Sequence, residues 1–131
     1  MLFNQFVKGD RLQFVDTTFH LVYQIESEFE IMARLVDDFL AAPPTDPTRI
    51  ASLDSLEFYL HQHDNAVDFV EALQGVSRVI VPSLNSSVEI HKAAACFIVG
   101  SAAQSNPRVQ IAFFEAGLVN TLLRLVNSPS R

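Results

Sequence analysis

The sequence repeats itself at an interval of 42 residues between about residue 46 and residue 129. Gly75 and Gly117 each end an apolar run and are separated by that interval. The same offset pairs further residues of similar character: Asp64 with Asn106, Val67 with Val109, Phe69 with Ile111, Ile80 with Leu122 and Leu84 with Val126. Repeats of about 40–47 residues are typical of armadillo and HEAT solenoids. The sequence therefore predicts two stacked units, residues 46–87 and 88–129.

The first unit is predicted to contain a long helix, a short helix and a third helix. Asp46-Pro47 is an N-cap residue followed by proline, so the long helix is expected to begin there and to run to about Gln62. The short helix is expected to be capped by Asp64 and to stop near Gly75. A glycine there tolerates the left-handed conformation that often follows a helix. The third helix is predicted at residues 76–84.

The second unit repeats this order. Ser86 and Glu89 form the S-x-x-E pattern of a capping box, which predicts a long helix over residues 88–104. Asn106-Pro107 is expected to cap the next helix, which ends at Gly117, and a last helix is predicted at 118–126. The alternation of long and short helices is typical of armadillo rather than HEAT repeats.

A separate amphipathic helix is predicted before the units, within residues 18–45. Its apolar residues follow helical spacing: Val22, Ile25, Phe29, Met32, Val36, Phe39 and Leu40. Its charged residues fall mostly on the other side and are expected to face solvent: Glu26, Glu30, Arg34, Asp37 and Asp38. A proline-rich linker then ends the helix. We expect this helix to cap the open end of the first repeat. Residues 1–17 are left unassigned.

These patterns together predict an all-α, armadillo-like helical solenoid of about two repeats with an N-terminal capping helix. The long helix of the second unit is rich in small residues: Ala93, Ala94, Ala95, Gly100, Ser101, Ala102 and Ala103. Small side chains let neighbouring helices approach closely, as the innermost helices of a solenoid must. The open inner face of such a stack is a natural surface for binding another protein.

Several function classes are excluded or disfavoured by composition and spacing. A net charge of −6 without a Lys/Arg cluster argues against nucleic acid, and no apolar run is long enough for a membrane span. His61 and His63 point to different sides of a helix and lack further ligands, so no metal site is predicted. His91 and Cys96 likewise face different sides, and Cys96 is expected to be a small core residue. No phosphate-binding loop is present. We therefore expect no enzyme, no cofactor and no small-molecule substrate.

Asn85-Ser86-Ser87 is a sequon for N-linked glycosylation. Ser86 is also a natural cap for the helix that follows. Both roles are compatible, because the tripeptide falls at an exposed turn between the predicted units.

Residues 52–127 resemble the armadillo-type nucleotide exchange factors of the seventy-kilodalton heat-shock chaperones. The resemblance rests on the stretch from Leu53 to Phe69, with its Asp64-Asn65-Ala66 junction, and on Gly100 to Leu125, with Ser105-Asn106-Pro107-Arg108 and Glu115-Ala116-Gly117. It is greatest to the SIL-type branch of the endoplasmic reticulum, whose partner is the luminal chaperone BiP. The sequon at Asn85 coincides with one in that branch.

The resemblance implies a mechanism that needs no catalytic residue. Members of the family embrace a lobe of the chaperone's ATPase domain, so that its nucleotide cleft opens and ADP leaves, which assists protein folding and translocation. Such a factor binds the open state better than the closed, ADP-bound state. The implied partner is therefore the ATPase domain of a BiP-like chaperone, and the implied location is the endoplasmic reticulum lumen.

The groove face of an armadillo long helix usually carries an aromatic and a polar residue four positions apart. This pattern places Phe97 and Ser101 in the groove, with Ser55 and Tyr59 at comparable positions in the first unit. Three residues extend the predicted stripe: Gln62, His63 and Gln104. For Phe97 a plain core position is the alternative. Tyr59 is the stronger candidate, because its hydroxyl suits a half-wet groove.

Two other hypotheses stay open: a cytoplasmic exchange factor of the same family, and a general armadillo scaffold that binds an extended peptide. The family has more repeats than the two predicted here, so the chain is expected to be a fragment or a shortened form. An uncapped last repeat would expose Leu118, Leu122 and Leu125 as an apolar patch.

Overall fold

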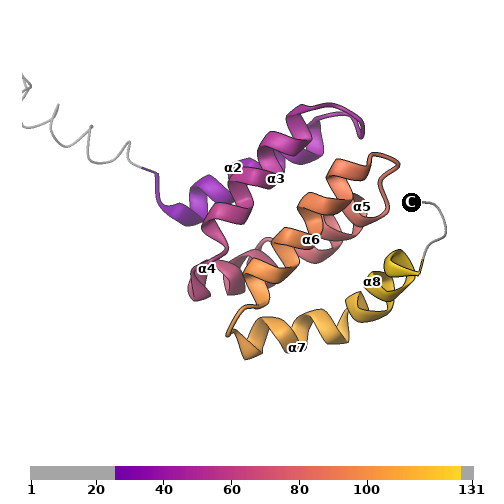
Figure 1. Cartoon of the computed structure of the whole chain (residues 1–131). Helices are drawn as coiled ribbons and strands as arrows, with labels where there is room; N and C mark the ends of the chain where they lie inside the picture. The colour runs from indigo at the N-terminus through magenta and orange to yellow at the C-terminus, as the bar shows by residue number, and fades with distance from the viewer. Residues whose placement is uncertain (1–25, 128–131) are drawn as a thin grey trace, which may run out of the picture.

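The computed structural model describes residues 26–127, which form helices and short connections and contain no strand (Figure 1). The predicted all-α class is confirmed. In order, the elements are α2 (Glu28–Ala41), α3 (Thr48–Tyr59), α4 (His63–Val67), the π-helical segments η1 (Asp68–Ala72) and η2 (Val76–Ile80), α5 (Val81–Leu84), α6 (Glu89–Ala103), α7 (Pro107–Glu115) and α8 (Leu118–Val126). The unassigned residues 1–17, the predicted helical turns at 18–25 and the end of the second predicted unit lie outside the described residues.

Helix α2 begins at Glu28, so the prediction of one unbroken helix from residue 18 is wrong. Ser27 has an extended backbone, and its hydroxyl accepts a hydrogen bond from the Glu30 amide at 3.1 Å. The Glu30 carboxylate in turn accepts from the Ser27 amide at 3.0 Å. This reciprocal pair is a capping box, which satisfies two helix-end donors and fixes the start of the helix.

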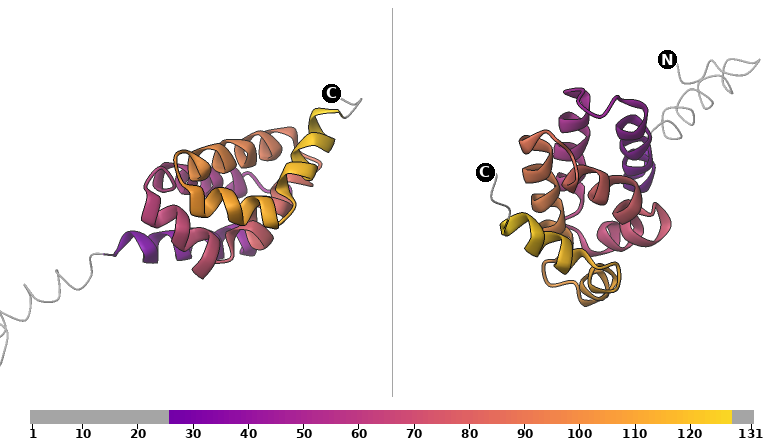
Figure 2. Two further views of the ribbon diagram at one scale, coloured as in Figure 1. Left: turned by 90° about the horizontal axis from the view of Figure 1, so that it is seen from below. Right: turned by 90° about the vertical axis from the view of Figure 1, so that its right-hand side faces the viewer.

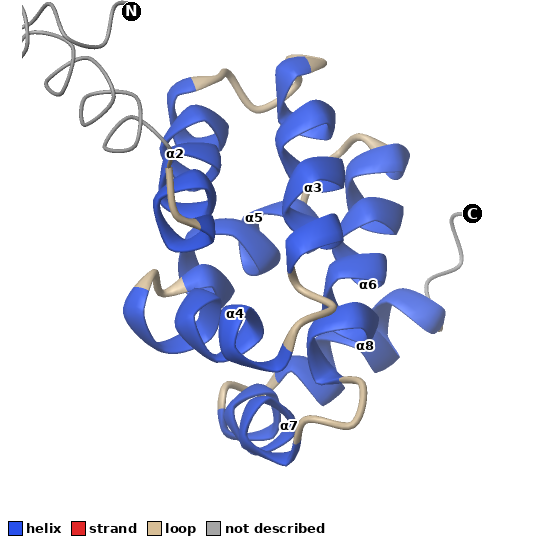
Figure 3. Cartoon of the chain, turned by 90° about the vertical axis from the view of Figure 1, so that its left-hand side faces the viewer, coloured by secondary structure: helices blue, strands red, loops and turns tan. Residues whose placement is uncertain are grey.

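The turn between α2 and α3 is held by polar contacts. The Asp46 carboxylate accepts a hydrogen bond from the Thr48 amide at 2.8 Å, as expected for a cap. Arg49 donates from Nε to the carbonyl of Ala42 at 3.1 Å. Its guanidinium lies 4.2 Å from the ring centroid of buried Phe39, a cation–π contact. These contacts fold α3 back against α2 (Figure 3).

The first unit is less regular than the sequence predicts. Helix α3 ends at Tyr59 rather than Gln62, and α4 begins directly after Gln62, so Asp64 lies inside the helix and is not its cap. Helix α4 continues into η1, where the Leu73 amide bonds to the carbonyl of Asp68, five residues earlier. Each such wide turn accommodates one extra residue. The sequence alone does not signal these two π-helical segments.

Gly75 and Gly117 occupy matching positions in the repeat but differ in backbone conformation. Gly117 has φ of 77°, the left-handed conformation expected after α7. Gly75 is right-handed, with φ of −64°, and the preceding Gln74 takes the left-handed conformation instead. A Cβ on Gly75 would lie 2.3 Å from ring atoms of buried Phe69. Gly75 is therefore required for close packing, and the prediction of a left-handed Gly75 is wrong.

Helices α3 and α6 lie side by side and form one layer of the molecule (Figures 1 and 2). Behind them, α2 packs on α3, and η2 with α5 packs on α6. Segment α4–η1 and helix α7 lie along one edge. Between the layers is one continuous core, whose largest fully buried side chains are Phe39, Phe69, Met32, Leu53, Leu56, Leu60, Ile80, Leu84, Ile98 and Leu118. The arrangement is that of an armadillo-like stack.

Polar contacts join the successive units. The Asn106 side chain donates to the carbonyl of His63 at 3.3 Å. Arg108 on α7 makes a two-pronged contact with Glu71 on η1, with both N–O distances at 2.7 Å. The predicted capping box at Ser86 and Glu89 is absent, because the Ser86 hydroxyl bonds to the Val88 amide instead.

Helices α7 and α8 expose several apolar side chains, but not the ones predicted. Leu118 is buried, and Leu122 and Leu125 are half-buried. The exposed apolar residues on these two helices are Ile111, Phe114, Val119, Leu123 and Val126. Within the described part of the chain, no single helix is long and apolar enough to span a membrane; α7 and α8 pass that test only as a pair, and they are bent by 75°.

We predict that Gly75→Ala destabilises the fold by about 1–3 kcal/mol, because the added methyl group must displace the buried ring of Phe69. Gly100→Ala is the matched control. A methyl group added to Gly100, which lies within α6, meets no neighbouring atom within 4 Å, so this change should be neutral or stabilise by up to about 1 kcal/mol. Urea unfolding followed by circular dichroism measures both. Equal stability of the two variants would contradict the prediction.

Candidate protein-binding site

The exposed residues of α3 and α6 recur at helical spacing and form one surface, which we call the long-helix face. It consists of Ala51, Asp54, Ser55 and Phe58 on α3 and of Glu89, Ile90, Ala93, Phe97 and Gly100 on α6. Because the two helices are neighbours in one layer, these residues face the same side (Figure 1). Three large apolar side chains are exposed on this face: Phe58, Ile90 and Phe97. Exposed apolar side chains that gather on one face are typical of protein-interaction surfaces.

The predicted site residues differ in their solvent exposure and in whether they lie on the long-helix face. Phe97 is 69% exposed, so the alternative of a core position is wrong. Ser55 is exposed on α3, whereas Tyr59 and Ser101 are half-buried at the edge of the core. The remaining three are exposed beyond the ends of the long helices: Gln62, His63 and Gln104. The predicted residues therefore form an interrupted stripe, with Phe97 as its most exposed aromatic side chain.

Phe58 is the exposed aromatic residue that the sequence reasoning missed. Its side chain is 70% exposed, and its ring meets that of Tyr59 edge to face, with centroids 5.2 Å apart. The buried positions of α3 are Ser52, Leu53 and Leu56. Phe58 falls opposite them in the helical period, so its outward direction follows from the spacing once the buried side of α3 is known.

A hollow of about 350 Å³ opens on the long-helix face between the two helices. Its lining consists of Asp54 and Glu57 from α3 and of Ala94 and Phe97 from α6. Ala94 is small enough to leave this space open beside the Phe97 ring. The hollow is therefore acidic on its α3 side and apolar on its α6 side.

Glu57 is held in place by two neighbours. The Ser101 hydroxyl donates a hydrogen bond to Glu57 Oε2 across the two helices. His61, in the turn just after α3, has its Nε2 2.9 Å from the same oxygen. Ser101 is thus occupied in tying α6 to α3, which weakens the hypothesis of a scaffold whose groove residues bond an extended peptide.

The described residues contain no group of three His, Cys, Asp or Glu side chains placed to hold a metal ion. His61 is directed to Glu57, and His63 lies exposed in the first turn of α4. The prediction that the two histidines do not converge is consistent with these positions.

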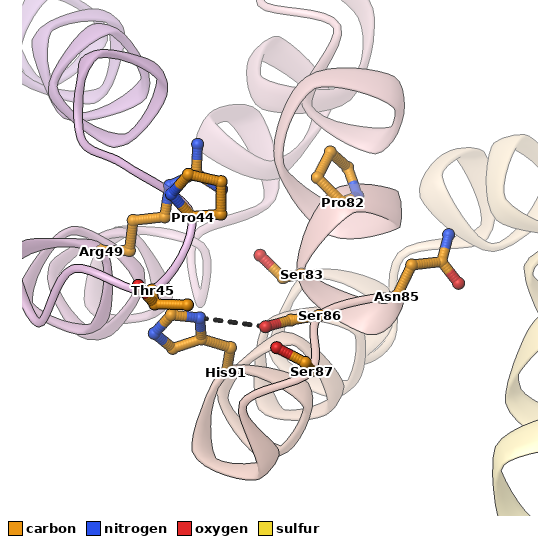
Figure 4. A pocket seen from close by; sticks show the side chains of 9 residues that line it. All are labelled: Pro44, Thr45, Arg49, Pro82, Ser83, Asn85, Ser86, Ser87 and His91. Carbon is orange, nitrogen blue, oxygen red and sulfur yellow. Dashed lines mark hydrogen bonds between the residues drawn. The ribbon is translucent and has the colours of Figure 1, made fainter.

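A second hollow, of about 400 Å³, lies between the α2–α3 turn and the α5–α6 turn (Figure 4). Buried His91 lines it, with Nδ1 3.3 Å from the Ser86 hydroxyl. Asn85 ends α5 and is exposed, and its amide is directed away from the other labelled side chains. The side chain of the sequon is thus accessible from solvent.

Cys96 is exposed, so the expectation of a core position is wrong. It lies on α6 beside Phe97, at the margin of the long-helix face. Partial burial of its sulfur raises the pKa of the thiol. At neutral pH the thiol therefore holds its proton more tightly than a free cysteine does, which is unfavourable for a nucleophile.

Comparison with known proteins places these helices in a family. The profile described as the SIL1/FES1/HPBP1 C-terminal domain matches residues 65–131, about half of the chain. The chain belongs to this family. The matched part includes the whole of α6, α7 and α8.

Individual relatives extend the match toward the N-terminus. The nucleotide exchange factor SIL1 of Xenopus laevis is 38% identical over 99 residues, and that of Mus musculus is 36% identical over 99 residues. Each alignment covers 76% of this chain and 21% of the relative. The Hsp70 nucleotide exchange factor FES1 of Mycosarcoma maydis is 30% identical over 120 residues, covering 92% of this chain and 30% of the relative. No solved structure gave a significant match.

The chain spans about a fifth of the length of the SIL1 relatives that it matches.

We predict that Cys96 is alkylated by iodoacetamide more slowly in the folded chain than in the same chain unfolded in urea. The raised pKa lowers the fraction of thiolate at any pH below it, so the pH profile of the rate should shift to higher pH on folding. Rates measured by mass spectrometry between pH 7 and 10 test this. A folded chain that reacts at the same rate or faster would contradict it.

Proposed function

We propose that the chain serves as a binding part of a nucleotide exchange factor for a seventy-kilodalton heat-shock chaperone. The observation that carries the proposal is the family match at residues 65–131, together with relatives whose names describe nucleotide exchange and, for FES1, the Hsp70 partner. Because the chain spans about a fifth of the SIL1 relatives, we assign to it contact with the chaperone, while exchange is an activity of the longer proteins.

The proposed contact surface is the long-helix face and its edges. It comprises Phe97 and Phe58 as exposed aromatic anchors, with Ser55, Tyr59, Gln62, His63, Ser101 and Gln104 around them. Exposed aromatic side chains surrounded by polar ones are typical of the centres of protein interfaces. The face is supported on rigid helices, so little conformational entropy is lost when a partner docks.

The proposed mechanism is a shift in a conformational equilibrium. The ATPase domain of the chaperone exchanges between a closed, ADP-bound state and an open state. A surface that fits the open state better raises its population and so speeds release of ADP. By the same linkage, ADP weakens binding of the exchange factor. No covalent bond changes in this process, and we propose no catalytic residue, cofactor or small-molecule substrate for the chain.

We further propose that the chaperone is the BiP-like member of the endoplasmic reticulum lumen and that the chain assists protein folding and translocation there. Two observations support this proposal: identity to the SIL1 proteins of Xenopus laevis, Rattus norvegicus and Mus musculus is 36–38%, against 30% to both Drosophila melanogaster Sil1 and FES1, and the side chain of Asn85 in the sequon is exposed. A cytoplasmic partner is the alternative.

Release of fluorescently labelled ADP from the isolated ATPase domain tests the proposed function. We expect the 131-residue chain to bind this domain, and a full-length relative such as the Xenopus laevis protein to accelerate release. An absence of binding by the chain would contradict the contact that we assign to it. An absence of acceleration by the full-length relative would contradict the mechanism.

Phe97→Ala and Phe58→Ala are each predicted to weaken binding to the ATPase domain by about tenfold or more, as loss of an aromatic anchor typically does. Phe114→Ala is a matched control, because Phe114 is equally exposed, at 71%, but lies on α7 outside the long-helix face. Isothermal titration calorimetry compares the three variants, and circular dichroism checks that each is folded. A larger effect of Phe114→Ala than of the other two would place the contact elsewhere.

Asn85→Gln is predicted to abolish a glycan when the chain is directed into the secretory pathway of cultured cells. Treatment with an N-glycosidase should increase the gel mobility of the wild-type chain and leave the variant unchanged. Ser87→Ala, which removes the sequon hydroxyl, should behave in the same way. A wild-type chain that enters the lumen without gaining a glycan would contradict the proposed modification.

A further inference from the structure

The hollow on the long-helix face combines two chemical surfaces within one cavity. Asp54 and Glu57 supply carboxylates from α3, and the Phe97 ring supplies an exposed apolar wall from α6. A ligand that satisfies both must be long, apolar along its length and positively charged at its end. Among protein side chains only those of arginine and lysine have this form.

The two carboxylates are available to such a ligand. Asp54 is exposed and makes no ion pair with any residue in 26–127. Glu57 is oriented by Ser101 and His61, and only one of its oxygens takes part in these contacts. The other oxygen of Glu57 is thus free to accept a further hydrogen bond. Because Ser101 and His61 already fix the orientation of the carboxylate, a ligand that binds it loses little side-chain entropy in ordering it.

The charges around the hollow favour a cation. Both acids lie on a chain whose net charge is −6. The arginine and lysine side chains on the two long helices are engaged elsewhere. Arg49 bonds to the α2–α3 turn, and Lys92 pairs with Glu89 at 3.2 Å. Apart from His61, which contacts Glu57, the described residues offer the two acids no basic partner, and Asp54 in particular is unpaired among them.

Building on the proposed function, we propose that this hollow receives an arginine or lysine side chain that projects from the chaperone's ATPase domain. The aliphatic stem of that side chain lies along the Phe97 ring, where its charge also gains a cation–π contact. Its cationic end lies between Asp54 and Glu57. A cavity of about 350 Å³ accommodates one such side chain. The hollow thus selects a partner by charge as well as by shape.

The test measures the affinity of the chain for the ATPase domain at several salt concentrations. Asp54→Asn and Glu57→Gln each remove one charge while keeping the shape of the side chain. Each is expected to weaken binding by about five- to tenfold at low salt and to reduce the dependence of the affinity on salt. Phe97→Leu keeps an apolar wall but loses the cation–π contact, and it is expected to weaken binding by about two- to fivefold.

Glu115→Gln is the matched control, since it changes the net charge equally but lies at the end of α7, outside the hollow. It should leave the affinity nearly unchanged, which separates a local contact from general attraction between charges. Circular dichroism of Glu57→Gln confirms that loss of the charge leaves α3 and α6 folded. An Asp54→Asn variant that is folded isolates the cation contact from the Ser101 bond.

Three results would overturn the inference, and they are distinguishable. If wild-type chain does not bind the ATPase domain, both the proposed function and this inference fail. If wild-type chain binds but Asp54→Asn and Glu57→Gln bind equally well or more tightly, the hollow does not receive a cationic side chain and only this inference fails. An equal loss with Glu115→Gln would likewise reject a specific site.

Discussion

Contact between the two long helices, α3 and α6, determines the arrangement of the other elements. Small side chains are buried on α6, at Ala94, Ala95 and Ala102, and Ala94 lines the space between the two helices. Small residues let two helix axes approach closely, and the larger Leu53, Leu56 and Ile98 then fill the core behind them. Because each long helix buries one side in this way, its opposite side stays exposed. The same packing therefore creates both the core and the surface available to a partner.

Much of the architecture could be predicted from the sequence, because an apolar repeat of 42 residues allows few folds. The order of helices and the exposed turn at Asn85 followed from capping residues, prolines and glycines. What could not be predicted depends on contacts between distant residues. Gly75 and Gly117 occupy matching positions in the repeat. Gly75 is required because a Cβ there would clash with the ring of Phe69, whereas Gly117 is required because its backbone is left-handed. A periodic pattern cannot distinguish these two reasons for a glycine.

Sequence alone also could not predict which individual side chains of the site are exposed. The rule that pairs an aromatic with a polar residue located Phe97 correctly on the surface, but it favoured Tyr59, which is half-buried, over its neighbour Phe58. A rotation of one residue is about 100° on a helix, so small errors in phase exchange buried and exposed positions. The phase of α3 became known only once its contacts with α2 and α6 were seen.

The carboxylate of Glu57 has two roles. It accepts the hydrogen bond from Ser101 that links α3 to α6, and it lines the hollow on the long-helix face. A cation that binds the free oxygen of this carboxylate, as proposed above, draws charge from the oxygen that accepts from Ser101 and so weakens the link between neighbouring repeats. A change in the distance between α3 and α6, in turn, changes the geometry of the hollow in which the cation is proposed to bind. If the cation docks as proposed, binding and the contact between the two repeats are coupled through a single acidic group.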